Sequence, residues 1–302
     1  MGKIRRQIRR NANRTKSREP LTVTVTGGLT PVCPGPSRRG LDGEIFVAIK
    51  ELYSFVYEMR HNVQVPNGVQ DEETAVQRYL AYLSVLVQIG LDEMALSATH
   101  GNDTAVLMKQ RMLVEYAAKA QYFNDNPDYA LFMTTIDAAE SVLTKLQNDP
   151  SVPIDVLESR KRDLADKQLR FSRVMGIQKL RFSQLMKRIG AGADYPWLYG
   201  APSALIHGDP EGMEQILPVD DQGKMTVVIS LPDDQLNAMM VDAGGNTVMF
   251  CDVFVARFRS DDDSLKDHLQ RLSRTFKRLT LKHPFGRNQD VLDSFKAELD
   301  SA

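Results

Sequence analysis

Apolar side chains recur at intervals of three and four residues through most of the chain after residue 40, and this period is that of an amphipathic α-helix. The first such segment carries it on Ile45, Ile49, Leu52, Phe55, Val56 and Met59. Short runs rich in Pro, Gly, Asn and Asp separate the segments: PNG at 66–68, HGND at 100–103, NDNPD at 124–128 and NDPSVP at 148–153. The pattern therefore predicts a mainly α fold, an irregular bundle of helices.

Within this bundle we predict helices over roughly 41–60, 71–99, 104–123, 129–146, 154–189, 233–258 and 263–281. The second is apolar on most sides in its middle, so we expect it to be the most buried. Asp103 is expected to cap the third helix, and Gly244–Gly245 to make the sixth irregular. A short helix is expected to end at His207, and the β-branched run at 225–231 predicts a small β-hairpin or ordered loop.

The first 40 residues differ from the rest in charge. They carry ten Lys/Arg and one acid, a net charge of +9, whereas the remainder carries 28 basic and 38 acidic residues, a net of −10. Pro and Gly interrupt this stretch, so we predict a disordered basic arm over 1–40, a single helical domain over 41–285 and a C-terminal tail over 286–302. The alternating segment LTVTVT at 21–26 can add a strand to another part of the chain. A basic arm is typical of contact with phosphate or anionic lipid, and folding back onto its own body is the alternative.

Several protein classes are disfavoured by motifs that the sequence lacks. There is no run of 18 or more apolar residues and no signal-peptide pattern, so we expect a cytoplasmic protein without a membrane partner. The two cysteines form no CxxC and the five histidines no HxxxH or HxxE, so we expect no metal. No GxGxxG, P-loop or GxSxG motif occurs, which disfavours nucleotide-fold and hydrolase-fold enzymes and their cofactors.

Arg111 and Glu115 stand at i and i+4 on the predicted third helix, with Lys119 one step further along the same face. The usual reading of such a pair is a surface ion pair, which contributes little to stability. Here the neighbouring positions leave little polar face, since they are Met112, Leu113, Val114, Tyr116, Ala117 and Ala118. We therefore expect the pair to be partly buried and to need further polar partners.

Tyr199, Ser203 and His207 recur at four-residue intervals and would share one face of a continuous helix. Histidine can accept and donate protons near neutral pH. Two features favour a structural role instead, since Pro202 is a typical first residue of a helix that excludes Tyr199, and a His at a helix C-terminus is favoured by the helix dipole. We predict that His207 joins the Arg–Glu pair in a buried polar cluster, and both roles stay open.

The helix RMLVEYAAKAQYF (111–123) and the later segment YGAPSALIHGDP (199–210) together resemble a bacterial all-helical domain-of-unknown-function family, which has an Arg-x3-Glu helix and a Tyr-x3-Ser-x3-His segment. That family is distantly similar to the HEPN superfamily, many members of which are ribonucleases in toxin and phage-defence systems. The resemblance spans roughly 41–280. It implies candidate catalytic residues His207, Arg111 and Glu115, supported by Ser203 and Tyr199.

The nuclease signature of the HEPN superfamily is an Arg followed after four to six residues by a His, which act on the RNA phosphodiester. The chain has a literal match in Arg278-x4-His283, but Leu279 replaces the polar residue that often follows the Arg. Because so loose a pattern occurs by chance, Arg111 and His207 are the alternative pair. If the protein is an enzyme, the resemblance implies a metal-independent ribonuclease.

The predicted helix over 154–189 carries ten Lys/Arg between Arg160 and Arg188 against two acids, Asp163 and Asp166. Together with the arm it makes RNA or DNA a candidate partner, through Arg5, Arg6, Arg9, Arg10, Arg170, Arg173 and Arg181. Few aromatic side chains interleave with this charge, so stacking on single strands is weakly supported. The alternative is a solvated helix face.

Two functional hypotheses follow from these patterns. In the first, the protein is associated with nucleic acid and has a HEPN-like ribonuclease role in defence or toxin activity. In the second, it is a non-catalytic helical module that binds a partner protein, and its Arg, Glu and His cluster is a structural network. A third is a small-molecule pocket lined by Trp197 and Tyr199, for which the sequence identifies no ligand.

Overall fold

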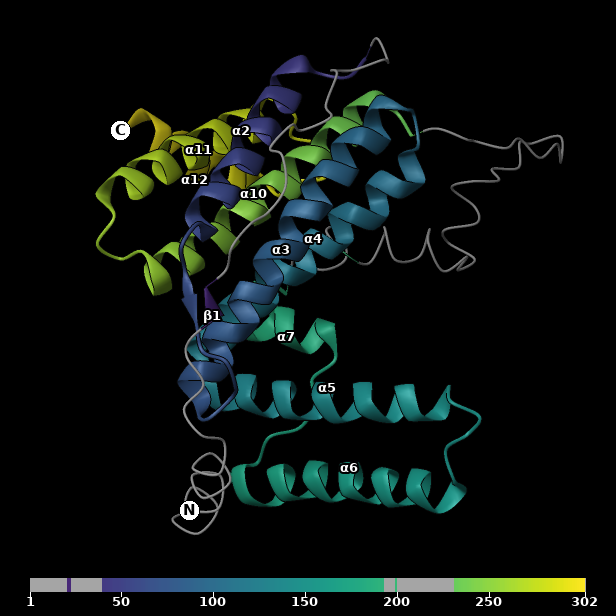
Figure 1. Ribbon diagram of the computed structural model, residues 1–302. Coiled ribbons are helices and arrows are strands. Elements are labelled where there is room, and N and C mark those ends of the chain that lie inside the picture. Colours follow the sequence, from purple (N-terminus) through teal and green to yellow (C-terminus); the bar gives the residue numbers. More distant parts are fainter. Residues whose placement is uncertain (1–20, 23–39, 193–198, 200–230, 302) are drawn as a thin grey trace, which may run out of the picture. The chain divides into compact units, whose positions relative to one another are not determined.

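The computed structural model describes residues 21–22, 40–192, 199 and 231–301. Within these ranges the protein is almost entirely helical (Figure 1), which confirms the predicted mainly α class. The nine helices of the described part are α2 (Gly43–Arg60), α3 (Glu72–Thr99), α4 (Asp103–Asp125), α5 (Pro127–Gln147), α6 (Ile154–Met175), α7 (Phe182–Arg188), α10 (Asp233–Phe258), α11 (Asp263–Lys282) and α12 (Gln289–Asp300). Most of the predicted arm, the helix that ends at His207 and the predicted hairpin up to residue 230 lie outside the described residues.

Two short strands accompany the helices. β1 (Leu21–Thr22) pairs antiparallel with β2 (Gln64–Val65), and Leu21 stands opposite Val65. The alternating LTVTVT segment thus supplies a strand through its first two residues, and the partner strand follows α2.

The chain divides into two compact units. Of the described residues, unit 1 comprises 21–22, 64–82 and 122–182, and unit 2 comprises 40–63, 83–121, 183–192, 199 and 231–301. The segment 286–302, expected to be a tail, contains the helix α12, which packs on α11 in unit 2.

Aromatic side chains form the core of unit 1. The ring centroid of Phe123, near the end of α4, lies 4.5 Å from that of Tyr79 and 5.4 Å from that of Tyr129 on α5. Phe132 on α5 continues this series to Phe171 on α6, at 5.2 Å and nearly edge to face. α6 packs along α5 (Figure 1), yet none of its residues is buried. α6 is therefore attached along a narrow stripe and exposes most of its surface.

The single helix predicted over 154–189 is wrong, because α6 ends at Met175 and α7 begins at Phe182. Gly176 adopts the left-handed conformation at φ 67°, and its N–H donates to the Ser172 carbonyl at 3.1 Å, which closes the helix end. The chain then runs along α5, where the Leu180 N–H donates to the Tyr129 hydroxyl at 3.0 Å. The residues on both sides of Gly176 follow the helical period, so the sequence pattern did not indicate that this glycine ends the helix.

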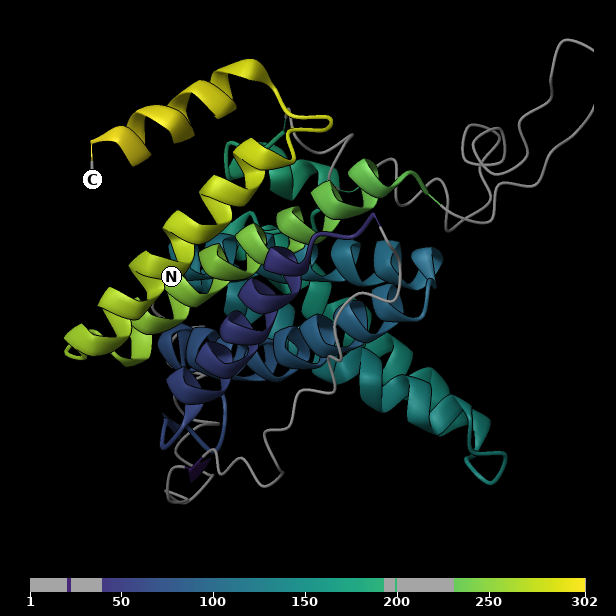
Figure 2. The ribbon, with the colours of Figure 1, turned by 90° about the horizontal axis from the view of Figure 1, so that it is seen from above.

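α10 is the most buried helix of unit 2 and contacts α2 and α11, which also contact each other (Figure 2). The predicted irregularity at Gly244–Gly245 is wrong, since α10 runs unbroken through both residues. A Cβ on Gly244 would overlap the ring of Phe276 on α11. The glycine therefore permits a close approach of two helices rather than a kink.

The prediction that the second helix is the most buried is also wrong. On α3, Tyr82 and Ile89 are 60% and 48% exposed. In the most apolar stretch of each helix, 72% of α10 is buried against 56% of α3. Both helices are long and apolar enough, by length and composition alone, to cross a membrane. The apolar residues of α3 lie on more than one face of the helix, and the other described residues do not bury all of these faces.

Asn102, not Asp103, caps α4. The Asn102 Oδ1 accepts a hydrogen bond from the Ala105 N–H at 3.2 Å. Asp103 is instead the first helical residue, and its Oδ2 accepts from the Leu231 N–H at 2.7 Å. This buried carboxylate fixes the chain that leads into α10.

Candidate functional site

The predicted Arg–Glu pair lies on α4 within unit 2, at the edge of the buried face of the helix. Leu113, Val114, Ala117 and Ala118 are buried, whereas Arg111, Glu115 and Lys119 are partly exposed. A row at i, i+4 and i+8 follows the side of a helix, so the three charged side chains border the core. The expected partial burial of the pair is confirmed.

Tyr199 is the polar partner that the pair was expected to need. The Arg111 Nη2 donates to the Tyr199 hydroxyl at 2.7 Å, and the guanidinium carbon stands 4.4 Å from the ring centroid. The hydroxyl in turn donates to Glu115 Oε2 at 3.4 Å, and Lys119 pairs with the other oxygen of Glu115 at 2.5 Å. Tyr199 is 8% exposed. The result is one continuous network, Arg111–Tyr199–Glu115–Lys119, which we call the α4 cluster.

The structure brings Arg111, Glu115 and Tyr199 together although 84 residues separate Glu115 from Tyr199. Ser203 and His207, the other two predicted members, lie outside the described residues. Their place beside the α4 cluster stays a prediction.

Arg278 and His283, the literal match to the HEPN signature, lie at the end of α11. Arg278 is exposed. His283 Nε2 lies 2.8 Å from Oδ2 of Asp42, the N-cap of α2, and Lys282 Nζ lies 2.7 Å from the same oxygen. Burial would raise the pKa of Asp42, but hydrogen bonds from Lys282, His283 and the Glu44 backbone outweigh it and lower the pKa from 3.8 to about 2. His283 thus joins α11 to α2.

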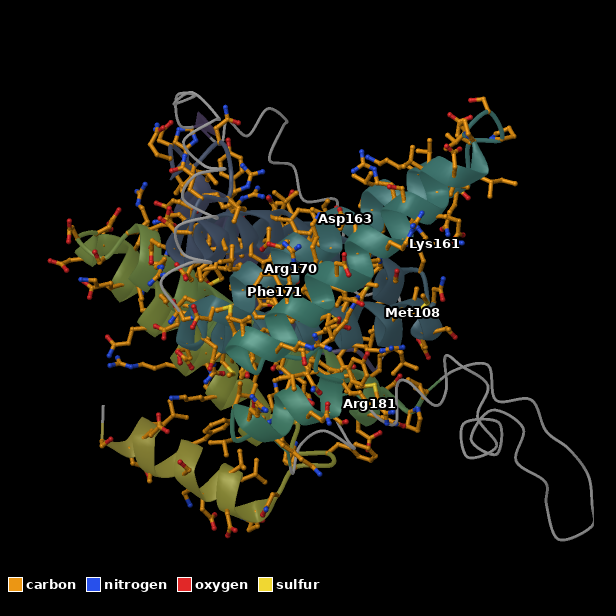
Figure 3. The ribbon with its side chains drawn as sticks, turned by 90° about the horizontal axis from the view of Figure 1, so that it is seen from below. Met108, Lys161, Asp163, Arg170, Phe171 and Arg181 are labelled. Atoms are coloured by element: carbon orange, nitrogen blue, oxygen red, sulfur yellow. The ribbon has the colours of Figure 1, made fainter. Side chains whose placement is uncertain are left out.

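The candidate nucleic-acid residues do not share one helix. Arg170 and Arg173 are exposed on α6, and neither makes a hydrogen bond or ion pair with any residue that the structure describes. Arg181 lies beyond the end of α6, in the segment that leads to α7 (Figure 3). Arg5, Arg6, Arg9 and Arg10 lie outside the described residues.

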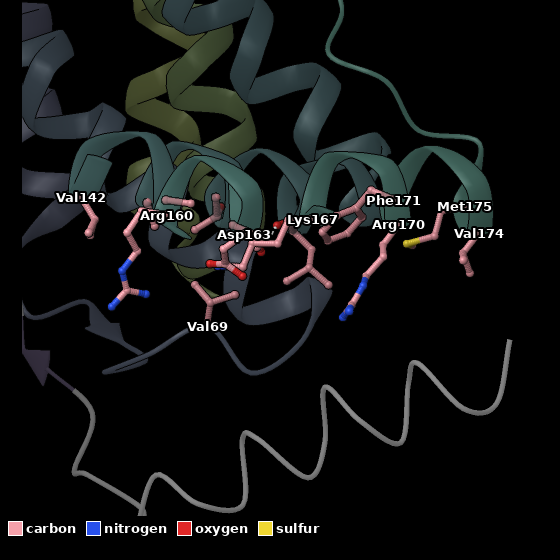
Figure 4. Close-up of a pocket in the computed structure, with 14 residues that line it drawn as sticks. Val69, Val142, Arg160, Asp163, Lys167, Arg170, Phe171, Val174 and Met175 are labelled. Atoms are coloured by element: carbon pink, nitrogen blue, oxygen red, sulfur yellow. Dashed lines mark hydrogen bonds and ion pairs between the residues drawn. The ribbon is translucent and has the colours of Figure 1, made fainter. Parts of the chain in front are cut away.

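A groove between α5 and α6 in unit 1 was missed by the sequence analysis. It has a volume of about 580 Å³ and is lined by Ala138, Ala139 and Val142 of α5 and by Phe171 and Val174 of α6, among others (Figure 4). Charged side chains of α6 stand along it, namely Arg160, Asp163, Lys167 and Arg170. We call it the α5–α6 groove. The only sequence signal was the pair of small residues at 138–139, which becomes a groove only where α6 packs beside it.

Among the residues that the structure describes, no three His, Cys, Asp or Glu side chains gather where they could hold a metal ion. Comparison of the chain with known proteins gives no match to a family model, to a curated protein or to a solved structure. The resemblance to HEPN proteins therefore stays a prediction.

Proposed function

We propose that the protein is a non-catalytic helical interaction module, in which the α4 cluster stabilises unit 2 and a partner binds elsewhere. The observation that supports this proposal best is the network of contacts that joins Arg111, Tyr199, Glu115 and Lys119. The guanidinium of Arg111 contacts both the hydroxyl and the ring, and the Glu115 carboxylate is held by Tyr199 and Lys119. These side chains already use one another as partners.

Catalysis on a phosphodiester would make different demands on the same residues. The Arg would have to be aimed at the transferring phosphate, and donors would have to point to where charge develops. Here the aromatic ring covers one face of the Arg111 guanidinium, and Tyr199 is itself buried. A substrate would have to displace a charge-assisted hydrogen bond and a cation–π contact, which together stabilise by about 2–3 kcal/mol.

A double-mutant cycle on Arg111 and Tyr199 tests this structural role. Tyr199→Phe keeps the ring and removes the hydroxyl, so we expect it to lower the free energy of unfolding by about 1–2 kcal/mol. Arg111→Ala should cost about 2–3 kcal/mol, and the double variant should cost clearly less than the sum. Tyr57→Phe on α2 is the matched control, since no hydrogen bond of its hydroxyl to a described residue is present. Additive single effects would contradict the proposal.

Association with RNA or DNA is a second candidate, favoured by the exposed Arg170 and Arg173 on α6. Charge on one helix face is the footprint of phosphate binding. This candidate predicts that binding of a labelled RNA weakens steeply as salt rises and that Arg173→Glu reduces it at every salt concentration. Absence of binding at low salt would exclude it.

A further inference from the structure

The α5–α6 groove combines an apolar floor with charges of one sign at its two ends. On the α5 side the floor is made by small or apolar side chains, and Val142 there is 47% exposed. On the α6 side, Val174 is 43% exposed. Both valines line the same groove as Ala138, Ala139 and Phe171. A shared apolar surface of this kind marks an interaction site in soluble proteins more often than isolated exposed residues do.

Among the described residues, two cations along the groove have no counter-ion. Lys167 Nζ pairs with Asp163 Oδ2 at 2.8 Å, so these two neutralise each other in the middle of the groove. Arg160 and Arg170 have no hydrogen bond or ion pair within the part of the chain that the structure describes. In Figure 4 both point to the same side of α6, on either side of Asp163. Ten residues of α-helix separate them by about 15 Å.

The dimensions suit a short helix. The α5 side of the groove runs from Leu131 to Val142, which corresponds to about 16 Å of helix, or three turns. Amphipathic helices commonly lay one apolar face into such a groove and use residues at i, i+3, i+4 and i+7 as anchors. A ligand with a single anionic head would neutralise only one of the two arginines.

We propose that the α5–α6 groove binds an acidic amphipathic helix of a partner protein, which rests on the proposed role as an interaction module. The apolar face of that helix packs on Val142, Phe171 and Val174, and two carboxylates about three turns apart pair with Arg160 and Arg170. The chain's own residues 1–20 are poorly suited to this position, because they carry eight Lys/Arg and one acid.

The test is a selection of helical 16-residue peptides from a display library on the full-length protein. Enriched peptides are expected to be acidic, with Asp or Glu about ten or eleven residues apart and apolar residues at helical spacing between them. For such a peptide, Arg160→Glu/Arg170→Glu should weaken binding by about 10-fold or more, since close charge pairs across an interface contribute strongly. The matched control is Arg162→Glu/Arg173→Glu, which makes the same charge change on α6 at positions that do not line the groove. It should change binding by less than about 2-fold.

Five results would overturn the proposal. The first is enrichment of basic or neutral peptides, and the second is an equal loss of binding in the two double variants. The third is binding of an acidic peptide only after residues 1–20 are removed, which would make the arm the occupant of the groove. A dimer that is lost in Arg160→Glu/Arg170→Glu would make a second copy the occupant, and loss of RNA binding in that variant without any peptide binding would make the groove a nucleic-acid site. None of these results changes the double-mutant cycle on the α4 cluster, so the two proposals fail separately.

Discussion

Gly244 and Gly245 are neighbours in the middle of α10, yet their replacement by Ala is expected to change stability in opposite directions. A Cβ on Gly244 would overlap the ring of Phe276, whereas nothing lies within 4 Å of a Cβ on Gly245. Phe276 is 2% exposed, so its ring is held by the core and has little room to move away. The two positions therefore separate the helical preference of Ala from the packing of α10 on α11.

The magnitudes follow from two opposing effects. Replacing a helical Gly by Ala stabilises by about 0.5–1 kcal/mol, because the unfolded chain loses less conformational freedom on folding. Gly245→Ala should show this gain. At position 244 the same gain is opposed by overpacking, which costs about 1–3 kcal/mol or more when a rigid ring must shift. We expect Gly244→Ala to lower the free energy of unfolding by about 1–2 kcal/mol.

Urea denaturation followed by circular dichroism at 222 nm measures both changes. Adding Phe276→Leu to the Gly244→Ala variant tests the cause. Because the ring is removed, the loss of unfolding free energy in the double variant should be smaller than the sum of the losses in the two single variants. Equal effects of the two Ala substitutions, within about 0.5 kcal/mol, would refute the close approach of α10 and α11 at this point.

Two further predictions concern titratable groups of unit 2. The pKa of Asp42 lies below its ordinary value of 3.8, at about 2. Its pairing with Lys282 and His283 therefore stabilises the fold at pH values above 3.8, and this stabilisation is lost as the pH falls towards 2. Asp42→Asn should therefore lower the free energy of unfolding by roughly 1–2 kcal/mol near neutral pH, after allowance for solvent screening, and the difference should vanish in acid; a constant difference between pH 4 and 2 would rule out the charge as the cause. Burial raises the pKa of the Cys251 thiol, so in a Cys33→Ser variant a maleimide should label the folded protein at least about 100-fold more slowly than the unfolded chain, and rapid labelling would show that α10 opens locally.

The helices themselves could be predicted because their signals are local. The spacing of Ile45, Ile49 and Leu52 alone indicates α2, and the Asn126–Pro127 pair alone separates α4 from α5. Glycine was harder to interpret, because its role depends on what surrounds it. Gly176 ends a helix and Gly244 admits a neighbouring ring, and the sequence pattern around each gave no way to tell these roles apart.

Part of the candidate site could also be predicted, because its signals are local in the sequence. The apolar neighbours of Arg111 and Glu115 indicated partial burial and a missing polar partner, and the four-residue spacing drew attention to Tyr199. The α5–α6 groove gave no comparable signal. Arg160 and Arg170 look like part of a solvated face until α5 is placed beside them, and that placement is a tertiary property.

The measurement that tests the account most directly is cleavage of a mixed pool of labelled RNAs by the full-length protein, with thermal melting of the same preparations. Wild type and His207→Ala are purified in parallel, so that a contaminating ribonuclease would appear in both. If the protein is a non-catalytic module, neither preparation cleaves RNA above the buffer control. Cleavage by wild type that disappears in a His207→Ala variant of unchanged melting temperature would contradict the account and identify an active site.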